Sequence, residues 1–160
     1  MSRASIDDAL ALVTEHFRGI ADEDGEPYIE HCLRVMHGVG SDPLAQQVAL
    51  MHDLIEDTAV QVSDLERLDF DPRVIEAVDL ITHRRDVSYA SYIVGLSDNP
   101  LARAAKLADL RDNASLSRVL FRQEQESPDT QRIQRYILSY QYLEGRLDEP
   151  SYLERMSRIR

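Results

Sequence analysis

Ionisable and apolar side chains are interspersed in the segment LMHDLIEDT, residues 50–58, in a pattern that could support metal-dependent chemistry. His52 and Asp53 come four residues before Glu56 and Asp57. In a helix, each member of the first pair would lie above the corresponding member of the second. The other positions are apolar, so all four groups are expected to be buried or nearly so. Burying adjacent carboxylates is unfavourable unless a metal ion or a cationic partner compensates them. For this segment alone, a metal site and a half-exposed acidic face are equally compatible with the sequence.

Further candidate residues lie in two other segments. His31 occurs in PYIEH, where Pro27 is expected to begin a helix, although a lone histidine on an apolar face is usually structural. In AAKLADLRDN, Asp109 follows Lys106 by three residues and precedes Asn113 by four, so the three side chains share one helix face. For Lys106, contact with a phosphate group and a salt bridge to a buried carboxylate are equally compatible with this spacing.

The elements that would position these residues are all predicted to be helices. Apolar residues recur at helical spacing through most of the chain, and no convincing strand alternation competes with them. Proline precedes several of these segments, where its fixed φ suits a first helical turn. Helices are expected over residues 5–18, 27–39, 43–58, 63–68, 71–83, 88–97, 100–120 and 129–146. Loops are expected at the acidic stretch 22–24 and from Gln123 to Pro128.

Composition favours one domain over residues 1–160, and the helical periodicity makes this domain all-α. The chain has 160 residues, of which 43% are hydrophobic and 29% charged, enough for one buried core. Cys32 is the only cysteine and is expected to be a small buried filler. In the C-terminal helix, Ile133, Ile137 and Tyr140 form a stripe with Leu143 or Leu147, for which core packing is favoured over dimerisation.

The formal net charge of −11 argues against a broad nucleic acid surface and against anionic membranes. No apolar run approaches the ~20 residues that a membrane span needs, and the acidic start does not resemble a secretory signal. A cytoplasmic location is therefore expected. A strongly anionic small substrate would need a local positive site, made by a metal ion or by clustered Arg and Lys. The oligomeric state is left open.

The order of His31, then His52 with Asp53, then Asp109 along the predicted helices resembles the pattern of HD phosphohydrolases. Longer segments extend the likeness to the hydrolase domain of RelA/SpoT homologues, and to the small alarmone hydrolases in particular. The resemblance covers about residues 7–117 and rests on GEPYIEH (25–31), ALMHDLIEDT (49–58), LITHRR (80–85) and SYASYIVGLSDNPLARAAKLADLRDN (88–113).

This resemblance implies an HD-type helical bundle that removes the 3′ pyrophosphate from ppGpp or pppGpp, usually with Mn²⁺. It implies the metal ligands His31, His52, Asp53 and Asp109. It also implies that Glu56 and Asp57 handle the attacking water and that Asn113 contacts the substrate, with Lys106 as a further candidate for substrate binding. Two imidazoles and two carboxylates suit manganese better than a thiolate site would.

The loop before PYIEH departs from many relatives, which carry Gln and Lys or Arg where this chain has Ile20 and Glu23. The expected cation is therefore absent, and the identity of the nucleotide stays open. The alternatives are a nucleoside monophosphate, an adenine alarmone, a phosphorylated dinucleotide, or a non-catalytic nucleotide-binding module that regulates a partner. Cations that could substitute are Arg18, Arg84, Arg85, Arg103, Lys106 and Arg111, with Lys106 the best placed. Surface or supporting roles are expected for His16, His37 and His83.

Overall fold

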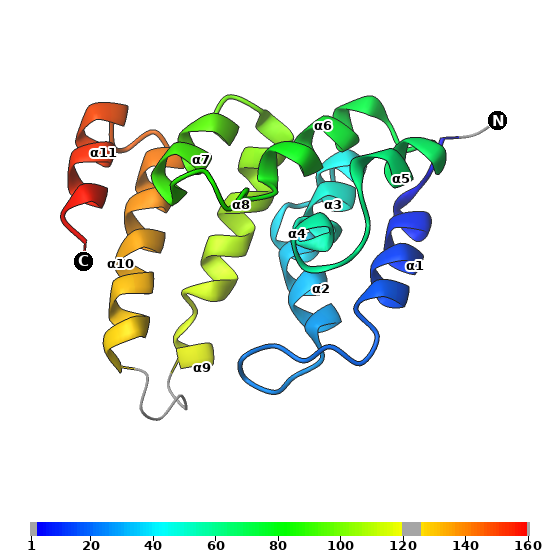
Figure 1. The fold of residues 1–160 in the computed structure, drawn as a ribbon, viewed down its shortest axis with the longest axis horizontal. Coiled ribbons are helices and arrows are strands. Elements are labelled where there is room, and N and C mark those ends of the chain that lie inside the picture. Colours follow the sequence, from blue (N-terminus) through cyan, green and yellow to red (C-terminus); the bar gives the residue numbers. More distant parts are fainter. Residues whose placement is uncertain (1–2, 120–125, 160) are drawn as a thin grey trace.

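The computed structural model describes residues 3–119 and 126–159 (Figure 1). Within these ranges the chain is helical, and its only β-type pairing is an isolated bridge between Ala21 and Pro27. The predicted all-α fold is confirmed. The helices are α1 (Ile6–His16), α2 (Tyr28–Gly38), α3 (Pro43–Leu50), α4 (Leu54–Asp57), α5 (Val62–Arg67), α6 (Pro72–Ile81), α7 (Tyr89–Leu96), α8 (Pro100–Asn113), α9 (Leu116–Val119), α10 (Glu126–Leu143) and α11 (Glu149–Ser157).

Several helices begin where the sequence predicts, because a proline and a capping side chain act together. A proline occupies the first turn of α3, α6 and α8, and Pro27 is the N-cap of α2. The residue before each first-turn proline accepts a hydrogen bond from a backbone N–H that the helix leaves unpaired. These capping residues are Asp42, Asp71 and Asn99.

Helix α3 is the centre of the packing. It contacts α1, α2, α6 and α8, and α2 also packs directly against α8. Figure 1 shows α1 to α3 on one side of α8, with α10 and α11 on the other side. The loop between α1 and α2 extends toward α9. Buried apolar side chains fill the space between the helices, among them Val13, Val35, Val48, Leu50, Ile93 and Leu110.

The predicted continuous helix over 43–58 is wrong, because the chain turns at residues 51–53 between α3 and α4. The His52 imidazole donates from Nδ1 to the carbonyl oxygen of Ala49 over 2.8 Å. That oxygen is the one that the Asp53 N–H would use in a continuous helix. The expected burial of all four ionisable groups is also wrong: His52 is buried and Asp53 half-buried, while Glu56 and Asp57 are exposed.

The C-terminal third differs from the prediction at several ends. Helix α8 ends at Asn113, and the short α9 follows where one helix to residue 120 was expected. Helix α10 begins at Glu126, inside the expected loop, whose first part lies outside the described residues, as does residue 120. Helix α11 was not predicted; it buries Tyr152, whose ring stacks on Tyr142. In the predicted apolar stripe Leu143 is buried, but Ile137 is 49% exposed.

Cys32 is buried, as expected for a small filler, and burial raises the pKa of its thiol to about 11. A thiol of this kind is inert at neutral pH. Among the described helices, none has the length and apolar character to cross a membrane.

The close approach of α2 to α8 depends on Gly38, because a Cβ at this position would lie 2.9 Å from Cβ of Ala108. We expect Gly38→Ala to lower the free energy of unfolding by about 1–3 kcal/mol through overpacking, although alanine is the better helix former. Gly95→Ala on α7 is the matched control, since its Cβ would meet nothing within 4 Å. It should raise the free energy by up to about 1 kcal/mol. Urea unfolding measures the free energy of unfolding of both variants. If Gly38→Ala stabilises the protein as much as Gly95→Ala does, the close contact between α2 and α8 is contradicted.

Candidate metal centre and nucleotide cleft

Two helices and a turn bring the predicted ligands together. His31 lies on α2, His52 and Asp53 in the turn after α3, and Asp109 on α8. The Nε2 atoms of His31 and His52 are 3.1 Å apart, and Oδ1 of Asp109 lies 3.2 Å from the first and 3.4 Å from the second. All three residues are buried and form a group that could hold a metal ion.

Asp53 lies at the margin of this group. Its Oδ2 is 2.8 Å from Nε2 of His52 and 3.8 Å from Nε2 of His31. The hydroxyl of Tyr28 donates a short hydrogen bond to the same oxygen. Burial acts to raise the pKa of the Asp53 carboxyl, but the charge of His52 outweighs it, so the pKa is lowered and the carboxylate is ionised.

Both imidazoles are oriented by acceptors on their outer side. Nδ1 of His52 donates to the carbonyl oxygen of Ala49, and Nδ1 of His31 lies 2.6 Å from Oδ2 of Asp112. A carbonyl and a carboxylate can only accept, so the proton is assigned to Nδ1 in each ring. Each Nε2 then presents a lone pair toward the carboxylate oxygens, an arrangement that requires positive charge between these atoms. The donor set therefore fits a divalent cation, with the supporting acceptors that metal-binding histidines need.

The pKa values of the histidines also indicate that positive charge is needed between these atoms. Burial alone would lower the pKa of His52, but the charges of Asp53 and Asp109 raise it well above its usual value. For His31, burial is likewise outweighed by hydrogen bonds to Asp109 and Asp112, and the pKa is raised. Protons therefore supply the positive charge when no ion does, and a metal ion must compete with them.

Asp109 is held from two sides by residues of its own helix. Nζ of Lys106 lies 2.8 Å from Oδ2 and Nδ2 of Asn113 lies 2.7 Å from Oδ1. Burial would raise the pKa of Asp109, but the charges of Lys106 and His52 lower it well below its usual value. Nζ of Lys106 also lies 5.7 Å and 5.3 Å from the ring centroids of Tyr89 and Tyr92. Of the two alternatives for Lys106, the structure shows the salt bridge.

A cleft of about 420 Å³ opens beside the cluster. Asp57 and Asn113 line it, whereas the carboxylate of Glu56 accepts the backbone N–H of His83 over 3.1 Å. Although the residue is exposed overall, partial desolvation of its carboxyl group and the charges of Asp53 and Glu56 raise the pKa of Asp57 to about 6. The lining residues are Phe17, Ile20, Ala21, Asp22, Glu23, Tyr28, His31, Asp57, Asn113, Arg118, Arg132 and Tyr136.

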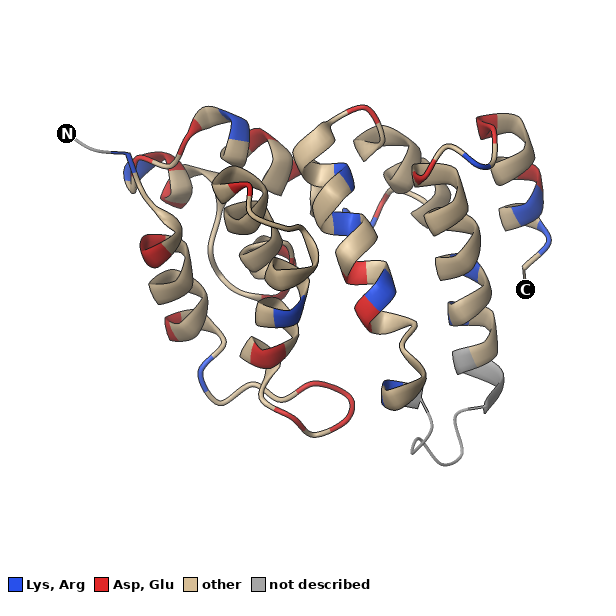
Figure 2. Ribbon diagram, turned by 180° about the vertical axis from the view of Figure 1, so that it is seen from behind, with Lys and Arg blue, Asp and Glu red and all other residues tan. Residues whose placement is uncertain are grey.

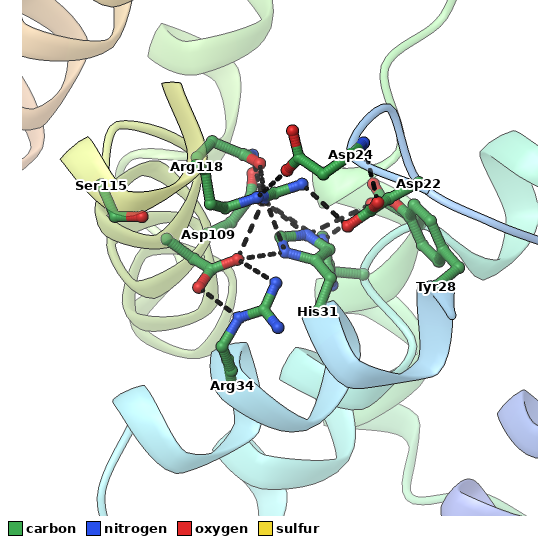
Figure 3. Close-up of polar contacts among 12 residues, drawn as sticks. Asp22, Asp24, Tyr28, His31, Arg34, Asp109, Ser115 and Arg118 are labelled. Atoms are coloured by element: carbon green, nitrogen blue, oxygen red, sulfur yellow. Dashed lines mark hydrogen bonds and ion pairs between the residues drawn. The ribbon is translucent and has the colours of Figure 1, made fainter. Parts of the chain in front are cut away.

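Two arginines of the cleft, Arg118 on α9 and Arg132 on α10, were not among the cations singled out in the sequence. Figure 3 shows Arg118 at the centre of a polar network above His31. Its guanidinium contacts Asp22 (3.2 Å), Asp24 (3.0 Å), Asp112 (3.1 Å) and Asn113 (2.8 Å). Arg132 pairs with Glu23 over 2.6 Å. Both lie beyond Asn113, where no motif points to them, and charge complementarity with the acidic loop was the only available signal.

Two of the other cations and two of the histidines considered in the sequence make contacts elsewhere. Arg84 pairs with Asp79, and Arg111 donates to the carbonyl oxygen of Gly38. Nδ1 of His37 contacts the carbonyl oxygen of Leu33 over 2.8 Å, and Nε2 of His83 contacts that of Val87 over 2.7 Å.

An all-helical fold around a His-His-Asp cluster defines a protein of the HD type. A solved structure shares this fold: a metazoan SpoT orthologue described as hydrolysing ppGpp superposes with a TM-score of 0.64 at 22% identity. The match covers 99% of this chain and 96% of the orthologue.

Curated proteins are similar in sequence as well. Two GTP pyrophosphokinases, from Streptomyces coelicolor and Streptomyces antibioticus, are each 30% identical over 143 residues. These alignments cover 82% of this chain but only 17% of each relative, so the chain spans about a sixth of their length. No family model matches the chain. The resemblance to the hydrolase domain of RelA/SpoT homologues is confirmed.

We expect Mn²⁺ affinity to fall when the pH is lowered from about pH 8 to about pH 6, because protons compete for the two Nε2 atoms. His52→Gln should weaken binding by more than about 100-fold. His37→Gln, an exposed histidine on α2, should leave it unchanged. Isothermal titration calorimetry measures the Mn²⁺ affinity of the unchanged protein and of the two variants. Mn²⁺ affinity that is independent of pH, or equal in the two variants, would contradict the prediction that His31 and His52 bind the metal ion through Nε2.

Proposed function

We propose that this chain is a divalent-metal-dependent phosphohydrolase that removes the 3′ pyrophosphate from a (p)ppGpp-like nucleotide. The observation that carries the proposal is the convergence of His31, His52 and Asp109 beside a cleft lined by Asp57 and Asn113. The likeness to a SpoT orthologue described as hydrolysing ppGpp supports the substrate. The curated relatives are named for pyrophosphokinase activity on GTP, which also points to this class of nucleotide.

His31, His52, Asp53 and Asp109 would hold the ion in this proposal. When bound, a divalent ion supplies Lewis acidity at a phosphoryl oxygen and lowers the pKa of nearby water. A mixed set of imidazole and carboxylate donors suits manganese, which we propose as the metal. Lys106 fixes Asp109 through Oδ2, which keeps Oδ1 directed toward the histidines.

Asp57 is proposed to accept a proton from the attacking water. Its pKa of about 6 is suited to proton transfer near neutral pH, and its side chain lines the cleft. Glu56 supports this role, because its charge helps to raise the pKa of Asp57. The His83 N–H holds Glu56 in place. Asn113 lines the same cleft and is proposed to contact the nucleotide.

A second candidate keeps the metal and changes the nucleotide to a nucleoside monophosphate, an adenine alarmone or a phosphorylated dinucleotide. It is favoured by Asp22 and Glu23 of the cleft lining, which pair with Arg118 and Arg132 and so offset the positive charge that a strongly anionic substrate would need. A substrate panel separates the two candidates.

We further propose that the chain acts as one hydrolase domain in the cytoplasm. The nucleotide substrate and the single cysteine, which is buried as a free thiol, favour this compartment.

With Mn²⁺ present, we expect the protein to convert ppGpp to GDP and pyrophosphate. Asp53→Ala and Asp57→Ala should each lower kcat by about 100-fold or more. Glu56→Ala should lower it less, because Glu56 acts through Asp57. Asp7→Ala, at an exposed position of α1, is the control. Each protein is incubated with ppGpp and with the nucleotides of the second candidate, and chromatography of the products measures its activity on each of them. Cleavage of another nucleotide while ppGpp survives would exclude the first candidate.

The pH profile tests Asp57 separately. At saturating Mn²⁺, kcat/KM should fall on the acidic side as Asp57 takes up its proton. Glu56→Gln removes a charge that raises the pKa of Asp57, so this limb should move to lower pH. Steady-state rates over a pH series show the shift. A limb that stays in place or moves to higher pH would exclude Asp57 as the proton acceptor.

A further inference from the structure

The loop between α1 and α2 has an acidic tip whose shape is set by Asp22. Oδ1 of Asp22 accepts the backbone N–H groups of Asp24 (2.9 Å) and Glu26 (3.0 Å). Gly25 adopts a φ of +83°, which glycine reaches without strain. Figure 2 shows this acidic loop extending from the body of the molecule. The turn thereby presents Glu23 and Asp24 on a loop held by its own hydrogen bonds.

Both tip residues pair with arginines far along the chain. Oδ2 of Asp24 lies 3.0 Å from Nε of Arg118, 94 residues away, and Glu23 bonds Arg132, 109 residues away. Glu23 and both arginines line the nucleotide cleft. The acidic tip therefore holds cations on the wall where an anionic substrate would enter.

The partners of Arg118 differ in how firmly they are placed. Asp112 and Asn113 contact Nη1 from the last turn of α8, and the buried side chain of Asp22 contacts Nη2. Asp24 contacts Nε from the loop tip, and its side chain is 21% exposed. Of the three carboxylates on Arg118, that of Asp24 is the most exposed, so it is the one that a ligand from solvent reaches first. The others keep the guanidinium in the cleft.

We propose that Arg118 binds a phosphate group of the substrate and that Asp24 occupies this position in the ligand-free protein as an internal competitor. This inference rests on the proposed function, because it takes the substrate to be a phosphorylated nucleotide. A guanidinium forms the same charge-assisted hydrogen bonds with a carboxylate and with a phosphate, so the exchange preserves them. Arg118 thus replaces the cation expected in the loop, where this chain has Ile20 and Glu23.

If Asp24 competes with the substrate for Arg118, substitutions of these two residues should change KM in opposite directions. Asp24→Asn should lower KM for ppGpp by about threefold or more, because the competitor is weakened. Arg118→Gln should raise KM by about tenfold or more, and Arg118→Lys by less, with kcat largely retained. The controls Asp7→Asn and Arg67→Gln make the same charge changes at exposed positions outside the cleft and should leave KM unchanged. If Asp24→Asn raises KM or leaves it unchanged, the competition is excluded.

Binding of the two products separates this inference from the proposed function. GDP and inorganic pyrophosphate are titrated into the Mn²⁺-loaded proteins by calorimetry, after circular dichroism has confirmed that each variant is folded. Tighter binding to Asp24→Asn and weaker binding to Arg118→Lys, for at least one product, supports the inference even if ppGpp is not hydrolysed. If ppGpp is hydrolysed but neither product shows this pair of changes, the inference falls and the proposed function stands.

Discussion

Acceptor atoms from separate parts of the chain meet in the interior, and the surrounding structure is organised to keep them there. The Nε2 atoms of His31 and His52 face each other at 3.1 Å, with Asp109 Oδ1 close to both. Buried acceptors at this spacing repel one another unless positive charge lies between them. Ala49 and Asp112 hold the outer nitrogens of the two rings. The chemistry of the cluster therefore fits a cation, and its neighbours set the direction of each side chain.

The packing of the helices keeps the residues of the cluster together. Helices α2 and α8 approach closely at Gly38, and both pack on α3. This brings His31 and Asp109 within reach of the turn that carries His52. On the open side of the cluster, the cleft is lined by Asp57 and Asn113. The acidic loop lines the same cleft with Asp22 and Glu23. Arg118 pairs with Asp22 and also contacts Asp112, the acceptor beside Nδ1 of His31.

Local signals explain which features the sequence could predict. Helical periodicity and first-turn prolines indicated the all-α fold. The resemblance to HD phosphohydrolases, carried by the order of His31, His52 with Asp53, and Asp109, indicated a shared site. The break at residues 51–53 was missed because it depends on one side-chain-to-backbone bond, from His52 to Ala49. Arg118 was missed because its partners lie up to 96 residues away and meet only when α9 packs beside the acidic loop. The catalytic and ligand roles of individual residues stay predictions.

The most direct measurement is a crystal structure of the protein grown with Mn²⁺, with anomalous diffraction data collected above the manganese absorption edge. We expect one strong anomalous peak at coordination distance from Nε2 of His31, Nε2 of His52 and Oδ1 of Asp109, with Asp53 turned toward it. The peak should be absent from crystals of His52→Gln. A cluster that stays closed by direct hydrogen bonds between the imidazoles and the carboxylates, with no peak at saturating Mn²⁺, would show that these side chains do not hold a metal ion.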